Sequence, residues 1–349
     1  MLKSMHLKNL TVFPDINFTF GRNLNVIIGD NGSGKSHILK AAYSFIAVSA
    51  QRGVTNPEDT PTRSVLEVFI AEKLRNVFRP DDLGRLARRK QGQTTCEMSY
   101  SFEDEGYNIS FQFSTRSKSE VAITKIPRKF IGKFPVFLPT RELLTIYPGF
   151  ISLYENSYTQ FEETWRDTCV LLANPLARGQ RAKTIKSMLK VLEDAMGGSI
   201  ELDKSGRFYL NTPDGNMEIN LVAEGLRKLA MLARLIATGS LLDKGYLFWD
   251  EPESNLNPKI IKSIARTILQ LSRSGIQVFI ATHSLFLLRE LHILQLSEFK
   301  NLESRYFGLH IEGNNMVSVQ QGNTIDDVGD IVALDEHLQQ SERYLDIQN

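Results

Sequence analysis

Residues 29–36 read Gly-Asp-Asn-Gly-Ser-Gly-Lys-Ser, and this spacing of glycines ahead of Lys35 and Ser36 suits a loop that holds phosphate groups. Glycines let the backbone wrap an anion, and successive N–H groups then point at its oxygens. Lys35 would add a positive charge beside the β and γ phosphates, and Ser36 would offer its hydroxyl to Mg²⁺. A glycine turn without a ligand is the alternative, but the loop follows an apolar strand pattern and precedes a helical one, as phosphate loops do. The predicted nucleotide-binding residues of this loop are Gly29, Asn31, Gly32, Ser33, Gly34, Lys35 and Ser36.

Two adjacent carboxylates, Asp250 and Glu251, follow the apolar run 246–249. In a parallel sheet, ligands bind beyond the carboxyl ends of the strands, which is where this pair would lie. Asp250 can hold Mg²⁺ together with Ser36, directly or through water, and Glu251 would then polarise the water that attacks the γ phosphate. The alternative is that the two acids merely begin a surface loop. The phosphate loop in the same chain favours the catalytic interpretation.

A further apolar run, 278–282, ends at His283, 33 residues after Asp250. A single histidine is more often structural than functional. At a strand end beside bound phosphate, however, an imidazole could hydrogen-bond the γ phosphate and respond to its presence. We therefore predict Glu251 and His283 as catalytic residues, and Ser36 and Asp250 as metal ligands.

Gly225 lies near the start of a long apolar helical pattern at 221–242. The N-terminus of a helix favours anions, and a glycine there lets a phosphate approach closely. Gly225 is therefore a further predicted nucleotide contact. The alternative is that this segment is a plain helix cap.

Strand patterns alternate with helical patterns over much of the chain, which indicates a largely parallel sheet with covered faces. Apolar alternation or short apolar runs predict strands at 2–7, 15–20, 24–28, 134–138, 246–249 and 277–281. Helical periodicity predicts helices at 35–50, 64–77, 221–242, 258–274 and 285–291, further helices within 151–196, and one from about 332. Turn signals predict a loop at 51–63 and hairpins at 96–113 and 305–320.

The composition, with 42% hydrophobic and 23% charged residues in a chain of 349, is that of a folded globular protein and excludes collagen-like and disordered classes. The two cysteines, Cys96 and Cys169, are too few and too far apart for a disulfide framework or a cysteine zinc site. No apolar run reaches the roughly 18 residues that span a bilayer. The N-terminus also lacks the apolar segment of a signal peptide. We therefore expect a cytoplasmic protein with no membrane contact.

The net charge of +1 hides an uneven distribution along the chain. Residues 85–133 contain ten Lys or Arg against five acids, whereas residues 325–349 contain seven acids against one Arg. The basic excess suggests that the first segment binds a polyanion, although a solvated surface is the commoner meaning of a charge run. If the partner is nucleic acid, contacts from basic residues of this segment would make binding strongly dependent on salt. The candidates are Arg88, Arg89, Arg128 and Lys129.

In their order along the chain, the segments GDNGSGKS, VAEGLRKLA, YLFWDEPESNLNP and FIATHS resemble those of the ABC-type ATPases, within the branch that includes RecF, SMC and OLD-like proteins. The resemblance covers about residues 1–50 and 205–290. It implies an α/β P-loop NTPase of the ABC-ATPase type, with a mixed sheet flanked by helices and a large α+β insertion. The ATPase head would comprise residues 1–51 and 205–349, and residues 52–204 would form a basic inserted lobe.

The resemblance also implies a role for each motif. Residues 29–36 would be the Walker A loop, Asp250 and Glu251 the Walker B pair, residues 254–257 the D-loop, and His283 the switch histidine. The resemblance implies ATP and Mg²⁺ as cofactors.

Gly225 would head the signature helix, which in this family caps the γ phosphate bound by the other subunit, so that ATP joins two heads. Two positions depart from the family pattern, because Ala223 replaces the signature serine and Asn257 replaces the D-loop acid. The Q-loop residue is not evident. Its nearest candidates are Thr140, Arg141 and Glu142.

The expected function is that of a Mg²⁺-dependent ATPase that acts as a slowly hydrolysing dimeric switch and controls a separately encoded effector protein. A homodimer or higher oligomer is expected on ATP binding, with nucleic acid as a further candidate partner. The middle segment resembles compact AAA-labelled ATP-binding proteins of bacteria, which suggests a defence or DNA-maintenance module. The chain shows neither the long coiled-coil arms nor the Toprim nuclease of larger relatives.

Two alternatives remain. A non-hydrolysing, ATP-bound scaffold could sequester a protein partner or a toxin, and the replacements at Ala223 and Asn257 favour it. The ATPase subunit of a membrane transporter is disfavoured by the degenerate signature and by the large insertion ahead of it.

Overall fold

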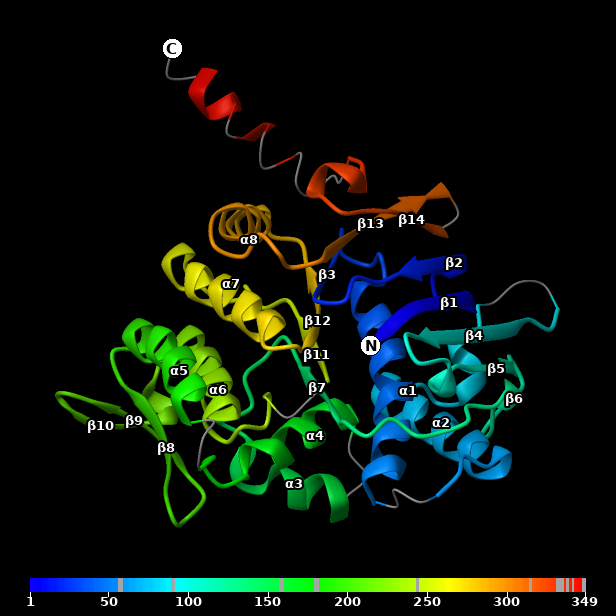
Figure 1. Cartoon of the computed structure of the whole chain (residues 1–349), viewed down its shortest axis with the longest axis horizontal. Coiled ribbons are helices and arrows are strands. Elements are labelled where there is room, and N and C mark those ends of the chain that lie inside the picture. The colour runs from blue at the N-terminus through cyan, green and yellow to red at the C-terminus, as the bar shows by residue number, and fades with distance from the viewer. Residues whose placement is uncertain are drawn as a thin grey trace.

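A six-stranded sheet forms the centre of the computed structural model (Figure 1), which describes residues 1–55, 59–88, 92–156, 160–178, 182–242, 245–313, 316–330, 336, 339–340 and 342–346. The strand order is β14-β13-β3-β12-β11-β7. The strands are β3 (Leu24–Gly29), β7 (Pro135–Leu138), β11 (Tyr246–Asp250), β12 (Gln277–Thr282), β13 (Ser304–Glu312) and β14 (Met316–Gly322). Neighbours pair in parallel except for β13 and β14, so the sheet is mixed, as the family resemblance implies.

Helices cover both faces of this sheet (Figure 1). The α-helices of the described residues are α1 (Lys35–Thr55), α2 (Arg63–Phe78), α3 (Tyr147–Asn156), α4 (Glu163–Leu172), α5 (Ala182–Met196), α6 (Glu224–Ala237), α7 (Pro258–Arg273) and α8 (Leu285–Ser297). Successive residues of a strand point to opposite faces, so β11 contributes Phe248 to the core that contains α1, and Leu247 and Trp249 to the core that contains α6 and α7. Its unbroken apolar run is therefore explained by burial on both sides.

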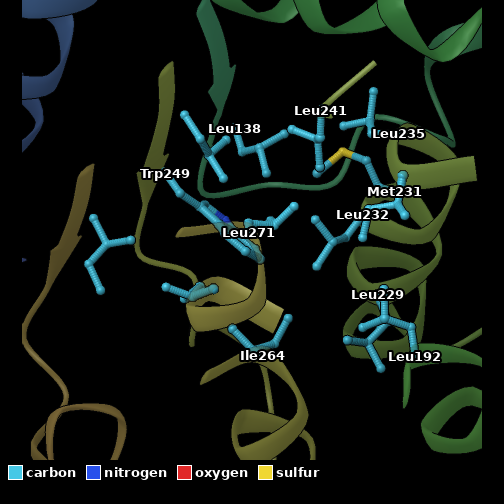
Figure 2. Close-up of a cluster of buried hydrophobic side chains, with 14 of the residues drawn as sticks. Leu138, Leu192, Leu229, Met231, Leu232, Leu235, Leu241, Trp249, Ile264 and Leu271 are labelled. Carbon is cyan, nitrogen blue, oxygen red and sulfur yellow. The ribbon is translucent and has the colours of Figure 1, made fainter. Parts of the chain in front are cut away.

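Trp249 fills the core behind the carboxyl end of β11, where its side chain is fully buried. Figure 2 shows Trp249 among Leu138 of β7, Leu271 of α7 and Leu232 of α6. This apolar wall fixes the end of the strand from which Asp250 emerges. Truncating such a side chain to alanine typically costs about 3–5 kcal/mol of stability.

Two antiparallel sheets flank the centre. The larger has the order β2-β1-β4-β5-β6, and its strands are β1 (Leu2–Leu10), β2 (Phe13–Thr19), β4 (Thr95–Phe102), β5 (Ile109–Ser114) and β6 (Ala122–Lys125). The smaller has the order β10-β9-β8, and its strands are β8 (Ser199–Leu202), β9 (Phe208–Thr212) and β10 (Gly215–Glu218). Short 3-10 turns lie at Leu83–Leu86 (η1), Glu105–Tyr107 (η2), Ile219–Leu221 (η3) and Ile325–Val328 (η5).

The segment 52–204, predicted as an inserted lobe, shares both large sheets with the rest of the chain. It supplies β4, β5 and β6 to the sheet that β1 and β2 begin, and it supplies β7 to the central sheet beside β11. The domain boundaries given above stay a prediction.

Local structure departs from the sequence expectations in a few places. The predicted loop at 51–63 is wrong at its start, because α1 continues to Thr55, and residues 56–58 of that loop lie outside the described part. Gly53 is explained by close packing, because a Cβ there would lie 2.5 Å from the Ile131 carbonyl oxygen. The predicted helix at 221–242 is shorter, because Val222 has an extended backbone, Ala223 is the N-cap of α6, and α6 ends at Ala237. Strands β6, β8, β9 and β10 have no counterpart in the predicted elements.

The predicted helix from about residue 332 falls largely on residues outside the described ones. Within the described residues, no helix combines the length and the apolar character that crossing a bilayer requires.

Candidate nucleotide site

The predicted phosphate loop joins the buried strand β3 to the first turn of α1. Lys35 begins this helix, and its Nζ donates to the carbonyl oxygens of Gly29 at 2.7 Å and Asp30 at 2.9 Å. These bonds hold the ammonium group over the loop. Burial lowers the pKa of Lys35, while the nearby charges of Glu251 and Asp250 act in the opposite direction. Because Asp250 ends β11 and Glu251 follows it, their charges act on Lys35 only if the phosphate loop and the carboxyl end of β11 lie close together. The two segments therefore form one site.

Two glycines of the loop have backbones that ordinary residues rarely adopt, with φ of +84° at Gly32 and +91° at Gly34. A Cβ on Gly34 would lie 2.7 Å from a ring carbon of Phe13 and 2.8 Å from a methyl of Val12. The loop is thus pressed against the start of β2.

The loop also offers a polar atom that suits a phosphate oxygen. Ser33 Oγ is buried, and no hydrogen-bond partner for it lies among the described residues. A buried hydroxyl normally has a partner. An anionic oxygen held by this loop would supply one, so the residues present fit a nucleotide phosphate.

Asp250 ends β11 opposite the start of α1, and its carboxylate accepts a hydrogen bond from the Ser36 hydroxyl. Burial raises the pKa of Asp250, which the Ser36 hydrogen bond partly offsets. A hydroxyl and a carboxylate are oxygen ligands of the kind that Mg²⁺ takes, together with phosphate oxygens and water. The two predicted metal ligands therefore lie together and fit this ion.

Glu251 and His283 form the second pair of the site. Glu251 Oε1 lies 3.1 Å from His283 Nδ1, and 24% and 42% of the two side chains are exposed. Strands β11 and β12 pair in parallel, so the residues that follow them meet at one edge of the sheet. Glu251 has φ of +44°, and its N–H donates to the Ala281 carbonyl at 2.9 Å.

Lys228 of α6 is a functional candidate that sequence reasoning missed. Its side chain is buried, and its Nζ donates to the carbonyl oxygen of Glu251 at 2.7 Å and to the Ser254 hydroxyl at 2.6 Å. Burial lowers the pKa of Lys228 to about 8, against the opposing effect of Glu253 and Glu251. Its place in the sequence, next to Arg227 near the start of an amphipathic helix, gave no signal of burial.

A second missed pair lies beneath the site. The hydroxyl of Thr282 donates to Glu253 Oε1 at 2.6 Å, and the Ser284 N–H donates back to that hydroxyl at 3.0 Å. Burial raises the pKa of Glu253. The pair joins the end of β12 to the segment after β11, and the acid that follows Pro252 was the only sequence signal for it.

Gly225, the predicted signature glycine, contacts the predicted D-loop of its own chain. A Cβ at Gly225 would lie 2.9 Å from the Asn255 carbonyl oxygen, so the glycine permits a close backbone approach. Beside it, Asn255 Nδ2 donates to Glu224 Oε1 at 3.0 Å. Ala223 is the N-cap of α6 and makes no side-chain cap hydrogen bond. The role of Gly225 toward nucleotide stays a prediction.

Asn257 has a structural role that accounts for its type. It is the N-cap of α7, and its side-chain oxygen accepts a hydrogen bond from the Ile260 N–H at 3.0 Å. Pro258 follows it at the first helical position. Asparagine and aspartate cap helices about equally well, so replacing the acid of the family pattern keeps the local structure.

Of the Q-loop candidates that follow β7, Thr140 contacts the predicted D-loop and Glu142 contacts α6. The Thr140 carbonyl accepts a hydrogen bond from the Ser254 hydroxyl at 3.2 Å. Glu142 Oε1 forms an ion pair with Arg227 Nε at 3.0 Å. Arg141 is exposed.

The basic residues proposed for nucleic acid are only partly available. Arg88 donates to the Val12 carbonyl at 3.0 Å, and Lys129 is ion-paired with Asp104. Arg128 is exposed, and Arg89 lies outside the described residues.

Comparison with known proteins agrees with this arrangement. A family model described as AAA_21 (AAA domain, putative AbiEii toxin, Type IV TA system) matches residues 24–289, which include every motif above. The chain belongs to this family. The AAA_21 match runs from β3 into α8 and makes the protein an ABC-like P-loop ATPase domain, for which ATP is the implied ligand.

Solved structures show the same fold for this AAA_21 protein. An Smc head bound to the C-winged helix domain of ScpA has a TM-score of 0.56 and 14% identity, over 93% of this chain and 98% of that chain. An Smc head with an extended coiled coil, bound to the C-terminal domain of ScpA derived from Pyrococcus furiosus, has a TM-score of 0.52 and 12% identity, over 99% of both chains. The predicted α/β P-loop fold of the ABC type is thereby confirmed. No curated protein sequence matches the chain.

Proposed function

We propose that this protein binds ATP with Mg²⁺ and hydrolyses it slowly, as a dimeric switch that controls a separate effector. The observation that carries the proposal is the 3.1 Å pairing of Glu251 with His283 beside the phosphate loop. A site that only bound nucleotide would not need a carboxylate held beside a histidine at that position.

Each residue of the site has a role in the proposed reaction. The loop residues and Lys35 bind the phosphates, and Ser36 and Asp250 would hold Mg²⁺. When bound, Mg²⁺ supplies charge neutralisation at the phosphate oxygens. Glu251 accepts a proton from water as the water oxygen bonds to the γ phosphorus and the bond from that phosphorus to ADP breaks. His283 holds the Glu251 carboxylate in place and can donate a hydrogen bond toward the γ phosphate.

ATP turnover by the wild type and by Glu251→Gln tests this proposal. General base catalysis contributes about 10²- to 10⁴-fold, so phosphate release should fall by at least about 100-fold in the variant. Size-exclusion chromatography with ATP and Mg²⁺ should show the variant accumulating as a dimer. Glu298→Gln, which removes an exposed ion pair with Arg266, is the matched control and should keep wild-type turnover.

A non-hydrolysing scaffold is the second candidate, and the first turn of α6 favours it. Ala223 offers no hydroxyl there, and the Glu224 carboxylate adds negative charge where the resemblance expects a partner's phosphate. If the wild type and Glu251→Gln both dimerise on ATP and neither releases phosphate, the scaffold proposal holds and the hydrolysing switch is wrong.

The effector part of the proposal rests on the family description, which names a putative toxin of a type IV toxin–antitoxin system. We propose that the ATP-bound dimer controls an effector in such a defence module, with nucleic acid as the sensed partner through exposed basic residues such as Arg128. Duplex DNA affinity should fall steeply between about 50 and about 200 mM salt. An affinity that does not change over this range contradicts nucleic-acid sensing.

A further inference from the structure

Glu251 holds a backbone conformation that is costly for a residue with a side chain. Its φ of +44° lies in the left-handed region, which glutamate adopts only where its surroundings enforce it. The direction of its carboxylate, toward His283, depends on this conformation. Whatever holds the Glu251 backbone therefore also aims the proposed base.

Three hydrogen bonds hold the Glu251 peptide groups, one at its N–H and two at its carbonyl oxygen. Its N–H donates to the Ala281 carbonyl of β12 at 2.9 Å. Its own carbonyl accepts from Lys228 Nζ of α6 at 2.7 Å and from the Ser254 N–H at 3.1 Å. The bond with Ala281 is fixed with the central sheet and the bond from Ser254 lies within the turn, whereas the bond from Lys228 comes from a helix outside the sheet.

Lys228 Nζ makes its hydrogen bonds to Glu251 and Ser254, in the turn that follows β11. Its remaining contacts are with the Ser254 hydroxyl at 2.6 Å and the Ser254 carbonyl at 3.4 Å, and only 2% of the residue is exposed. An ammonium group has three donors, and here all three point at the turn that follows β11. The hydrogen bonds of this buried ammonium group go to the Glu251 carbonyl and to Ser254, not to the Glu251 carboxylate.

The first turn of α6 is also tied to the segment after β7 and to the turn after β11. Arg227 pairs with Glu142 at 3.0 Å, and Gly225 packs against the Asn255 carbonyl. A shift of this turn would therefore move Lys228 relative to Glu251. The turn is also the part of α6 that the proposed dimer would bring to a partner's nucleotide.

We propose that Lys228 is a positioning residue that holds Glu251 in its left-handed conformation and so transmits the position of the α6 first turn to the base of the same protomer. The proposal rests on the proposed function for its consequence in hydrolysis. Its structural half, the hold on the Glu251 backbone, does not require hydrolysis.

The hydrolytic half is tested with Lys228→Met, which keeps an apolar stem and removes the donors, and with Lys228→Arg, which keeps donors. Loss of hydrogen bonds from a charged group predicts a fall in kcat of about 10- to 100-fold for Lys228→Met, with the KM for ATP within about twofold of wild type. Lys228→Arg should recover at least part of kcat. Wild-type kcat in Lys228→Met, or a fall that Lys228→Arg does not relieve, overturns the positioning role.

Lys73→Met is the matched control for loss of a buried lysine. Lys73 pairs with Glu163 at 3.0 Å and with Asp167 at 2.7 Å, in a cluster between α2 and α4. This variant should lower the melting temperature and leave kcat near wild type. If it lowers kcat as much as Lys228→Met does, the effect of Lys228 is general destabilisation and the proposal fails.

Hydrogen exchange separates this proposal from the proposed function. Without added nucleotide, amide hydrogens of the peptide that contains Glu251 and Ser254 should exchange at least about tenfold faster in Lys228→Met than in wild type. In Lys73→Met, the exchange rate of this peptide should equal that of wild type. Faster exchange in Lys228→Met, together with no ATP turnover by the wild type, would support the hold on Glu251 and reject hydrolysis. Unchanged exchange would reject the hold on Glu251 whatever the turnover.

Discussion

His283 Nδ1 lies 3.1 Å from Glu251 Oε1, and the two residues follow strands that are neighbours in the central sheet. Thirty-one residues separate them in the chain, yet the parallel pairing of Trp249 with Ile280 and of Asp250 with Ala281 sets their spacing. The pair is thus a product of sheet register, and a side chain at either position can be changed without moving the other backbone.

Replacing His283 by alanine should lower kcat by about 10- to 100-fold, because it removes one hydrogen bond to the Glu251 carboxylate. ATP affinity should change little, since the phosphate loop is untouched. Phosphate release and nucleotide titration check both parts. His283→Asn, which keeps a polar nitrogen near the same place, should show a smaller fall in kcat than the alanine variant. A variant with normal kcat, or one that fails to bind ATP, would contradict the assignment.

Gly34→Ala should weaken ATP binding by more than about tenfold. The new Cβ would combine a backbone φ of +91° with contacts of 2.7 and 2.8 Å to Phe13 and Val12, so the loop must shift. Gly32→Ala is the matched control, because its φ of +84° is similar but nothing lies within 4 Å of the added atom. A fluorescent ATP analogue measures both affinities. Equal losses in the two variants would show that φ alone matters and that the packing against Phe13 does not.

Asn257→Ala should lower the free energy of unfolding by about 1 kcal/mol, because the Ile260 N–H loses its cap. Asn257→Asp should be close to neutral, since aspartate caps equally well. Urea denaturation of the two variants measures the difference. If Asn257→Asp instead raises ATP turnover severalfold with unchanged stability, the residue acts in hydrolysis and the capping explanation is insufficient.

The buried imidazole of His37 should lower the free energy of unfolding when the pH becomes mildly acidic. Burial, with a smaller effect of Lys40, lowers its pKa to about 4 from 6.5. Between about pH 6.5 and pH 4, His37 is therefore protonated in the unfolded chain but neutral in the folded chain. The free energy of unfolding is unaffected by His37 above about pH 6.5 and falls as the pH drops toward 4. The loss from this group should be on the order of 3 kcal/mol at pH 4.

The measurement for His37 is urea denaturation at several pH values between 4 and 7, for wild type and His37→Gln. Glutamine cannot titrate and can keep a hydrogen bond to Thr11, whose hydroxyl lies 3.0 Å from His37 Nδ1. The slope of stability against pH should be smaller in the variant. Identical slopes would mean that His37 is protonated in the folded protein.

The sequence predicts most of the elements that carry the site. The loop at 29–36, the carboxylates after β11 and the histidine after β12 are recognisable because their chemistry demands particular residue types at strand ends. The structure brings Ser36 to Asp250 and Glu251 to His283, as the motifs suggest. The fold class was equally accessible, because alternating strand and helix patterns limit the architectures available.

The sequence does not predict the burial of Lys228 or the pairing of β7 with β11. Lys228 sits in an amphipathic helix where a lysine ordinarily faces water, and only the tertiary contact with Glu251 shows that it is buried. The strand at 134–138 was predicted, but its partner lies more than a hundred residues further along the chain, at Tyr246–Asp250. Local periodicity contains no information on such distant pairings.

The place of β7 limits how far this ATPase can be shortened. Its four residues are buried, and β7 is the last strand of the central sheet beside β11. A chain cut down to its motif-bearing halves would expose the backbone edge of β11, whose Leu-Phe-Trp run would then be free to pair with other molecules. Such a fragment should aggregate however complete its ATP motifs are. The smallest soluble unit of this protein must therefore retain a strand that bears none of them.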